Sequence, residues 1–387
     1  MAGSSDGVVG ESRKEPSPSP GEAAKGFLKP WAFVSICVMA GVLLLGSVPV
    51  VRIGDGGEMT QASKESDASQ QAQSLSEGIS PFEGAKHPAS AIPYEEHAAS
   101  GTLYALPDRE PRGVAFLFHG CTRDAKHFFE PYPEDVRITR TLLDAGLAVV
   151  VFQSQDRESK CWGVFQWSPK DDVEPVTEGL AKFAEEKETA LGLAGLPKLF
   201  IGFSSGGHFV TELVGRVNMD GALVYISRGE KGFSRYPDVP LPKKMAWLAM
   251  SQDRGSWAAS PSQVRAQIED NRQKEMKHRL WIAKPRPLEP LTLAERIAGV
   301  SLEQSKKAYE LAREGGYLTE TNLIQKDPRK TDIKKILLPV LEMEGYTEQE
   351  VTQHLSVVLN RLYCEHEMTD DFLPEMIEYL LEKRNRM

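Results

Sequence analysis

One short segment of the chain has the residue types and the spacing of a catalytic serine. The segment "KLFIGFSSGGHFV" contains a Gly-x-Ser-x-Gly pattern in which Ser204 lies between Gly202 and Gly206. A buried-type run precedes the pattern and helix-like apolar spacing follows it, so the serine is predicted at a tight strand-to-helix turn. Such a turn crowds side chains against the backbone, which favours small neighbours. We therefore predict that Ser204 is a nucleophile with an exposed Oγ, the alternative being a purely structural turn.

A serine nucleophile needs hydrogen-bond donors for the negative charge that develops on the attacked carbonyl oxygen. The backbone N–H of Ser205, one residue after the nucleophile, is the first candidate donor. The segment "FLFHGCTRD" ends an earlier apolar run, and the Cys121 N–H that follows Gly120 is the second candidate. His119 is expected to support this loop rather than to act as a base. An ordinary strand-to-loop turn is the alternative for this segment.

A catalytic serine also needs a base, and the base needs a carboxylate that orients it. In the strand–elbow–helix arrangement the acid follows the serine along the chain and precedes the base. The apolar run "MAWLAMSQD" ends at Asp253, which we predict as the acid. Asp238 lies before this run, and Glu269 and Asp270 lie in a helical pattern, so these three are weaker alternatives.

Three of the eight histidines follow Asp253 and could serve as the base. His366 lies in a short segment before a strongly amphipathic helical pattern, and we predict it as the general base. His354 falls inside a helical pattern and is typical of a structural residue. His278 precedes the apolar segment "RLWIAKP", a possible last strand, and is the main alternative to His366.

The elements that must position these residues predict an α/β fold. Apolar runs without polar alternation, such as "GVAFLF", "LAVVVF", "LFIGF", "GALVYI" and "KKMAWLAM", are separated by amphipathic helical patterns. Such runs indicate the buried strands of a mostly parallel, doubly wound sheet with helices on both faces. Sheets of this kind carry their chemistry at the carboxyl ends of the strands, where Cys121, Ser204 and Asp253 are all predicted.

Together these features resemble the α/β-hydrolase superfamily. The resemblance rests on the segments "HGC", "GFSSGG", "SQD" and "CEHEMTDDF" and covers about residues 100–255 and 360–385. The S-S-G-G elbow and the Cys161-Trp162 pair are also similar to those of hydrolase-like proteins of plants and algae. The resemblance implies no particular substrate. It implies a catalytic triad of Ser204, Asp253 and His366 and an oxyanion hole at the backbone of Cys121 and Ser205.

The chain departs from the superfamily pattern in the distance between the acid and the base. Roughly 110 residues separate Asp253 from His366, far more than the short step usual in these proteins. Helical patterns fill about residues 256–360 and predict an inserted helical cap. This cap could cover the site and shape its acyl or alcohol pocket, or it could be a docking surface.

The N-terminal part of the chain has a different composition. Residues 1–30 are rich in Ser, Gly, Pro and charge and are predicted to be a disordered tail. Residues 31–51 carry no charge over 21 positions, which is long enough for a single-pass transmembrane signal-anchor. Residues 52–100 are polar and predict a flexible linker to the hydrolase-like domain at 101–387.

The basic residues near this apolar stretch favour a cytoplasmic N-terminus and a catalytic body on the lumenal or extracellular side. A cleaved secretory signal or a plastid-type leader is the alternative. The net charge is −9 and no basic block stands out, so nucleic acid is not an expected partner. None of the four cysteines has zinc-like spacing, and we expect no metal and no organic cofactor. Cys121 and Cys161 could pair in an oxidising compartment, but isolated buried thiols are the simpler interpretation.

These observations predict a membrane-tethered serine hydrolase that cleaves an ester, amide or thioester through an acyl-serine intermediate. Its substrate would be a small-molecule or lipid acyl compound. An acyltransferase or a serine peptidase could use the same residues. A hydrolase-like binding scaffold without catalysis is the alternative of a different class. The residue pattern identifies neither the substrate nor the oligomeric state.

Overall fold

The structure of this protein is a computed structural model. The predicted tail (1–30) and membrane helix (31–51) lie outside the residues that it describes, as does most of the linker (52–100). Within the described part of the chain, no helix combines the length and the apolar character that crossing a membrane requires. The structure describes residues 90–163, 171–229, 239–254, 259–271 and 276–382.

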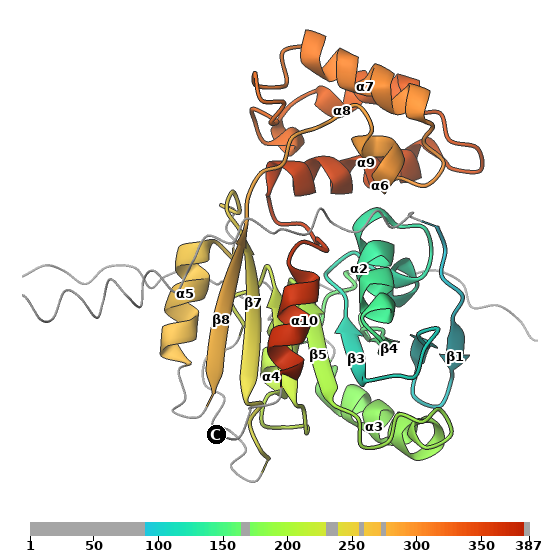
Figure 1. Ribbon diagram of the computed structural model, residues 1–387, viewed down its shortest axis with the longest axis vertical. Helices are drawn as coiled ribbons and strands as arrows, with labels where there is room; N and C mark the ends of the chain where they lie inside the picture. The colour runs from blue at the N-terminus through green and yellow to red at the C-terminus, as the bar shows by residue number, and fades with distance from the viewer. Residues whose placement is uncertain (1–89, 164–170, 230–238, 255–258, 272–275, 383–387) are drawn as a thin grey trace, which may run out of the picture. The chain divides into compact units, whose positions relative to one another are not determined.

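An eight-stranded, mostly parallel sheet forms the centre of the described body (Figure 1). Its strand order is β1-β2-β4-β3-β5-β6-β7-β8. Strand β2 runs antiparallel to both of its neighbours, and every pairing from β4 to β8 is parallel. The predicted parallel sheet is confirmed. The strands are β1 (Glu95–His97), β2 (Thr102–Ala105), β3 (Gly113–Phe118), β4 (Leu147–Phe152), β5 (Lys198–Phe203), β6 (Gly221–Tyr225), β7 (Lys244–Met250) and β8 (Lys277–Ala283).

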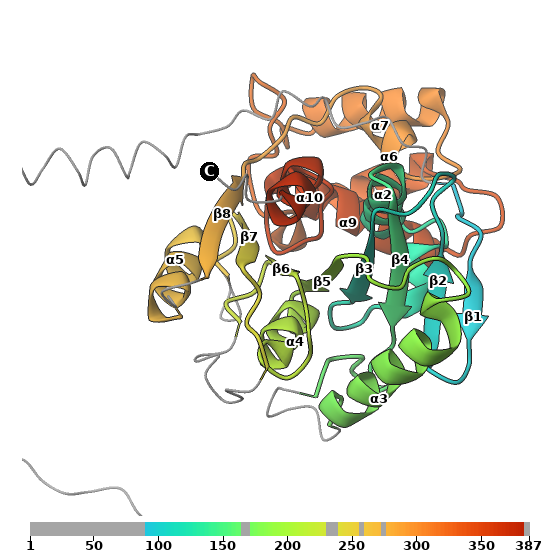
Figure 2. The same ribbon diagram turned by 60° about the horizontal axis from the view of Figure 1, so that its bottom comes forward.

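Helices cover both faces of the sheet, as the unbroken apolar runs predict (Figure 2). On one face α2 (Pro133–Asp144) and α10 (Leu373–Leu381) pack with the 3₁₀ turn η1 (Ala125–Phe128) over one hydrophobic core. On the other face lie α3 (Val173–Phe183), which continues into η2 (Ala184–Glu188), α4 (Ser205–Leu213) and α5 (Pro261–Asp270). Successive side chains of a strand point to opposite faces, so each buried strand contributes to both cores.

The inserted cap begins later than the sequence predicted. Helix α5 and strand β8 fall within the predicted insertion at 256–360, but they belong to the sheet and its covering layer. The reason is that β8 is an edge strand with alternating burial, so its segment lacks the long apolar run of the inner strands. The cap proper follows β8 and has its own hydrophobic core, from Leu288 to Leu362.

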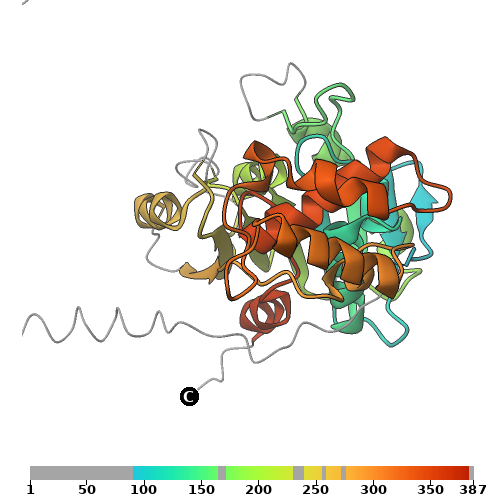
Figure 3. The same ribbon diagram turned by 90° about the horizontal axis from the view of Figure 1, so that it is seen from above.

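The helices of the cap gather at one end of the described body (Figures 1 and 3). Their chain enters after β8 and returns to the sheet through the end of α9, where the N–H of Arg286 donates to the carbonyl of Leu362 at 2.8 Å. The elements of the cap are α6 (Thr292–Arg296), α7 (Leu302–Glu314), η3 (Pro328–Lys330), α8 (Ile333–Leu337), η4 (Leu338–Val340) and α9 (Glu348–Tyr363).

Candidate active site

Ser204 lies in a strained backbone conformation between β5 and α4. Its φ is 51° and its ψ is −112°, in the positive-φ region that non-glycine residues seldom occupy. The turn is also closely packed. A Cβ added to Gly202 would lie 2.1 Å from the carbonyl oxygen of Gly206, and one added to Gly206 would lie 2.0 Å from that of Phe118. Both glycines are therefore required by the backbone, and the turn holds the serine at the carboxyl end of β5.

The three residues predicted as a triad form one hydrogen-bonded line. The Oγ of Ser204 lies 2.9 Å from the Nε2 of His366. The Nδ1 of the same imidazole lies 2.9 Å from the Oδ2 of Asp253. Both distances lie within the reach expected between a nucleophile, its base and the group that orients the base. The line joins residues from three separate parts of the chain at one edge of the sheet.

The carboxylate of Asp253 is almost fully enclosed, with 1% of its side chain exposed. It follows the end of β7, and its Oδ2 also accepts a hydrogen bond from the backbone N–H of Ala259 at 3.0 Å. The alternative acids Glu269 and Asp270 lie on or at the end of α5, in the layer that covers the sheet. Asp238 lies outside the described residues.

His366 is held against the end of β7 by backbone contacts on both sides. The N–H of Gln252 donates to the carbonyl of Cys364 at 3.0 Å, and the N–H of Glu367 contacts the Sδ of Met250 at 3.4 Å. Burial alone lowers the pKa of His366, but the hydrogen bond and the charge of Asp253 oppose it, and the net effect raises the pKa. The imidazole therefore faces the Ser204 hydroxyl through Nε2, and its pKa lies above the ordinary histidine value.

The other two histidines considered as bases lie elsewhere. His278 stands near the start of β8, and its Nδ1 accepts a hydrogen bond from the indole N–H of Trp247 at 3.1 Å. Parallel strands begin at the edge opposite to the one where Ser204 lies. His354 is buried in α9 of the cap between the rings of Tyr132 and Tyr346.

The loop after β3, which carries the predicted second oxyanion donor, lies against the elbow. A Cβ added to Gly120 would lie 3.6 Å from the Cβ of Ser204, so the chain passes Ser204 at van der Waals distance. Cys121 follows in this loop, and the N–H of Ser205 opens α4 directly after the nucleophile. Two backbone amides are thus carried by the segments that flank Ser204, the arrangement expected of an oxyanion hole.

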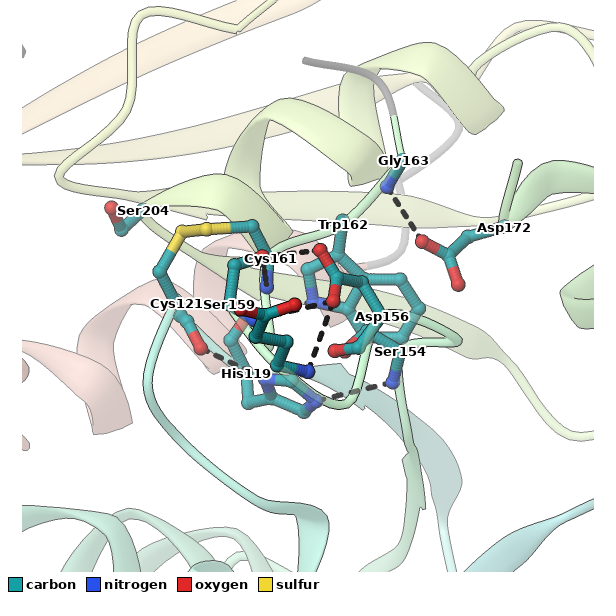
Figure 4. Close-up of a disulfide and its surroundings, with 12 residues drawn as sticks. His119, Cys121, Ser154, Asp156, Ser159, Cys161, Trp162, Gly163, Asp172 and Ser204 are labelled. Carbon is teal, nitrogen blue, oxygen red and sulfur yellow. Dashed lines mark hydrogen bonds between the residues drawn. A yellow bond between two sulfur atoms is a disulfide. The ribbon is translucent and has the colours of Figure 1, made fainter. Parts of the chain in front are cut away.

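Cys121 and Cys161 form a disulfide beside Ser204 (Figure 4). The simpler expectation of isolated buried thiols is therefore wrong for this pair. Their Cα atoms lie 4.2 Å apart although 40 residues separate them in the sequence. The pairing depends on how the loops after β3 and β4 meet, which residue spacing alone does not reveal. Cys364 is the free cysteine among the described residues, and it is buried.

His119 is fully buried between this loop and the loop after β4. Its Nε2 accepts the backbone N–H of Ser154 at 3.2 Å and faces the amide nitrogen of Gln153 at 2.7 Å. Its Nδ1 therefore carries the proton and donates to the carbonyl of Gly120 at 2.8 Å. Burial lowers the pKa of His119 to about 4, so the ring is neutral near pH 7.

The strand order and the strained serine elbow at the carboxyl end of β5 now identify the architecture. The chain has an α/β-hydrolase fold. Within the described residues of this hydrolase fold, no three histidine, cysteine or acidic side chains gather in a way that could hold a metal ion.

No protein-family model and no curated protein matches the sequence. Solved structures similar to this hydrolase fold include a carboxylesterase from Bacillus cereus, at 13% identity and a TM-score of 0.35 over 55% of this chain and 93% of that one. A thermostable carboxyl esterase from Bacillus coagulans aligns at 11% identity and a TM-score of 0.35, over 50% and 90% of the two chains. An S-formylglutathione hydrolase from Agrobacterium tumefaciens aligns at 12% identity and a TM-score of 0.33, over 50% of this chain and 91% of that one.

Sequence reasoning missed a group of buried charges beside the triad. The guanidinium of Arg123 lies 2.9 Å from a carboxylate oxygen of Glu367 and 3.7 Å from one of Asp135. Burial raises the pKa of Asp135 to about 7 despite the nearby Arg123, and burial also raises that of Glu367. Arg123 lies two residues after Cys121, and Glu367 directly follows His366. The useful sequence signal was this adjacency of charged residues to both predicted site segments.

Proposed function

We propose that the chain is a serine hydrolase that cleaves an ester, amide or thioester through an acyl-serine intermediate. The observation that carries this proposal is the hydrogen-bonded line from Ser204 through His366 to Asp253, with both distances at 2.9 Å. The strained turn at Ser204 adds support, because strain of this kind persists where a side chain must be presented to a substrate.

In the proposed reaction the Oγ of Ser204 attacks the substrate carbonyl while the Nε2 of His366 takes its proton. Asp253 accepts the hydrogen bond from Nδ1–H, so it orients the ring and stabilises the imidazolium that forms. The amides of Cys121 and Ser205 would bind the oxyanion of the tetrahedral intermediate. His366 then returns the proton to the leaving alcohol, amine or thiol, and the acyl group remains on Ser204.

Water completes the cycle. With the leaving group gone, the neutral Nε2 of His366 can take a proton from a water molecule as that water attacks the acyl carbon. Collapse of the second tetrahedral intermediate releases the carboxylic acid, and His366 returns the proton to Ser204. An alcohol in place of water would make the same residues an acyltransferase.

Hydrolysis of p-nitrophenyl acetate and of a short-chain thioester tests the proposal. Wild-type protein should hydrolyse at least one of these substrates, and Ser204→Ala and His366→Ala should fall to the background rate. His278→Ala is the matched control, because it removes the same kind of ring from β8 and should keep wild-type activity. Full activity in Ser204→Ala would contradict the proposal. A folded wild-type protein with no hydrolytic activity would favour the binding-scaffold alternative.

We also propose that residues 31–51 anchor the chain in a membrane and that the catalytic body lies in a lumenal or extracellular compartment. The uncharged 21-residue stretch supports the anchor. The disulfide between Cys121 and Cys161 supports an oxidising compartment for the body. Full-length protein should stay in the membrane pellet after alkaline carbonate extraction, whereas its release into the supernatant would contradict the anchor.

A further inference from the structure

Two loops at the carboxyl edge of the sheet meet beside Ser204. The first follows β3 and spans residues 120–124, including the Cys121 amide of the proposed oxyanion hole. The second follows β4 and spans residues 153–163. Figure 4 shows the Cys121–Cys161 disulfide between these loops, with Ser204 close to the sulfur atoms.

The second loop is held firmly by two buried carboxylates. Asp156 accepts the backbone N–H groups of Glu158 and Ser159 at 3.0 and 3.2 Å and the Ser159 hydroxyl at 2.5 Å. Asp172 accepts the N–H of Gln155 at 2.6 Å and that of Gly163 at 2.5 Å (Figure 4). Both ends of the Cys161 segment are therefore fixed by acceptors within the same body.

Trp162 fixes the Cys161 side of the bond still further. Its side chain is fully buried and stacks on Phe209 of α4, with ring centres 4.6 Å apart. Its indole N–H donates to the carbonyl of His119 at 2.7 Å. Trp162 therefore connects Cys161 to α4, the helix that follows Ser204.

The first loop depends on the second for its position. The N–H of Thr122 donates to the carbonyl of Ser159 at 3.1 Å. Asp124 forms ion pairs with Arg157 and Lys160 across the junction. Thr122 itself is exposed and has a φ of 65°, so local backbone preference does not favour the conformation that the loop adopts. The disulfide is the covalent part of this junction, and it includes Cys121, whose amide is the proposed oxyanion donor.

We propose that the Cys121–Cys161 disulfide positions the oxyanion amide of Cys121, and that its reduction by a dithiol lowers the rate of catalysis. This inference rests on the proposed function. An oxyanion donor acts only when it is held at the correct distance from the developing charge. A displacement of about 1 Å in such a group can cost roughly 100-fold in rate.

The chemistry of the reduction is a thiol–disulfide exchange. Cys121 is partly exposed and Cys161 is 6% exposed, so a thiolate of the dithiol would attack the sulfur of Cys121 and release the thiolate of Cys161. The second thiol of the reductant then displaces Cys121 as it closes its own disulfide. Two electrons pass to the protein, which gains two thiols, and the reductant becomes a cyclic disulfide.

The experiment compares oxidised and dithiothreitol-reduced full-length protein. Alkylation and intact mass give the redox state, and circular dichroism reports whether the fold is kept. The readouts are kcat and KM for the ester and the rate at which a fluorophosphonate labels Ser204. Reduction should lower kcat and the labelling rate roughly 10- to 100-fold while KM changes by less than about threefold, and reoxidation should restore both.

Three variants make the result specific. Cys161→Ala should be as slow as the reduced protein and insensitive to dithiothreitol. Cys364→Ser removes the buried free cysteine and should respond to the reductant as wild type does. Leu193→Ala creates a cavity in the buried segment before β5, near the end of that strand opposite to Ser204. It should lower the melting temperature and leave kcat unchanged, which separates positioning from general destabilisation.

A fourth variant covers the case in which loss of the bond unfolds the protein. Asp124→Asn removes the ion pairs of the same junction, keeps the disulfide and should lower kcat by roughly 3- to 10-fold. Equal labelling rates in folded oxidised and reduced protein would overturn the inference, as would wild-type kcat in both Cys161→Ala and Asp124→Asn. If oxidised protein is not labelled at Ser204 at all, the proposed function fails, and this inference fails with it.

Discussion

Arg123 and Glu367 connect the loop that carries Cys121 to the loop that carries His366. The guanidinium Nη2 of Arg123 lies 2.9 Å from the Oε1 of Glu367, and both side chains are largely buried. Arg123 stands two residues after Cys121, and Glu367 directly follows His366. The ion pair therefore fixes the distance between the proposed oxyanion loop and the proposed base.

Removal of the Arg123 guanidinium should lower both the stability and the activity of the protein. Arg123→Met leaves Glu367 and the fully buried Asp135 without their shared cation, and breaking a buried pair in this way typically costs about 3–5 kcal/mol. We expect a loss of stability of that order in urea unfolding and a fall in kcat. Glu367→Gln keeps an oxygen acceptor for Arg123 and should lose less stability than Arg123→Met. Wild-type stability in Arg123→Met would show that the pair does not hold the loops.

The pH profile reports the link between Asp253 and His366. The base acts only when neutral, and its pKa is raised, so kcat/KM should fall as the pH drops through a value above 6.5. Asp253→Asn removes the charge that raises the pKa and leaves only a neutral amide as hydrogen-bond partner, while burial still lowers the pKa. The acidic limb should then move to lower pH and kcat should drop about 10⁴-fold.

Asp108→Asn is the matched control for this change, because it removes a carboxylate from an exposed loop. Its pH–rate profile should overlay that of the wild type. An acidic limb that stays in place in Asp253→Asn would mean that the carboxylate does not tune the base.

The elbow glycines, Gly202 and Gly206, have no room for a side chain, whereas Gly192 does. A Cβ in Gly206→Ala would meet the backbone oxygen of Phe118 at 2.0 Å, which only a shift of the chain can relieve. Gly192 also has a positive φ, of 69°, but nothing lies within 4 Å of its added Cβ. Gly192→Ala should cost only about 1–2 kcal/mol, whereas Gly206→Ala should be insoluble or inactive. Thermal melts and the ester assay compare them, and an active, stable Gly206→Ala would contradict the described turn.

The cap is joined to the sheet domain by a buried ion pair. Arg296 of α6 pairs with Glu134 of α2, whose side chain is fully enclosed. Arg296→Met and Glu134→Met should each destabilise by about 3–5 kcal/mol, because each leaves one buried charge without its partner. The double variant should be more stable than the sum of the single losses predicts. A double-mutant cycle in urea measures this, and strict additivity would show that the two side chains do not interact.

The sequence was most informative where local pattern determines structure. Fully apolar runs such as those of β3 and β5 are buried on both faces, so their residues identified the inner strands directly. The elbow was predictable because Gly202, Ser204 and Gly206 must satisfy a local steric constraint. Edge strand β8 was harder to place because one side of it meets solvent. Its mixed pattern indicated only a possible last strand, which fell within the bounds of the predicted cap.

Features that depend on contacts across space were not predictable in the same way. The disulfide requires the loops after β3 and β4 to meet, and the spacing of Cys121 and Cys161 carries no sign of that meeting. The pairing of Arg123 with Glu367 joins residues 244 positions apart. Each partner is an ordinary surface-type residue in sequence, and only the fold makes the pair buried.

Mapping of a covalent adduct on the full-length protein tests whether Ser204 is the nucleophile. The protein is treated with a fluorophosphonate, digested and analysed by mass spectrometry, beside Ser204→Ala, His366→Ala and His278→Ala. We predict one phosphonylated serine, Ser204, with labelling lost in Ser204→Ala and His366→Ala and kept in His278→Ala. A folded wild-type protein that takes up no label, or takes it up on a residue other than Ser204, would contradict it.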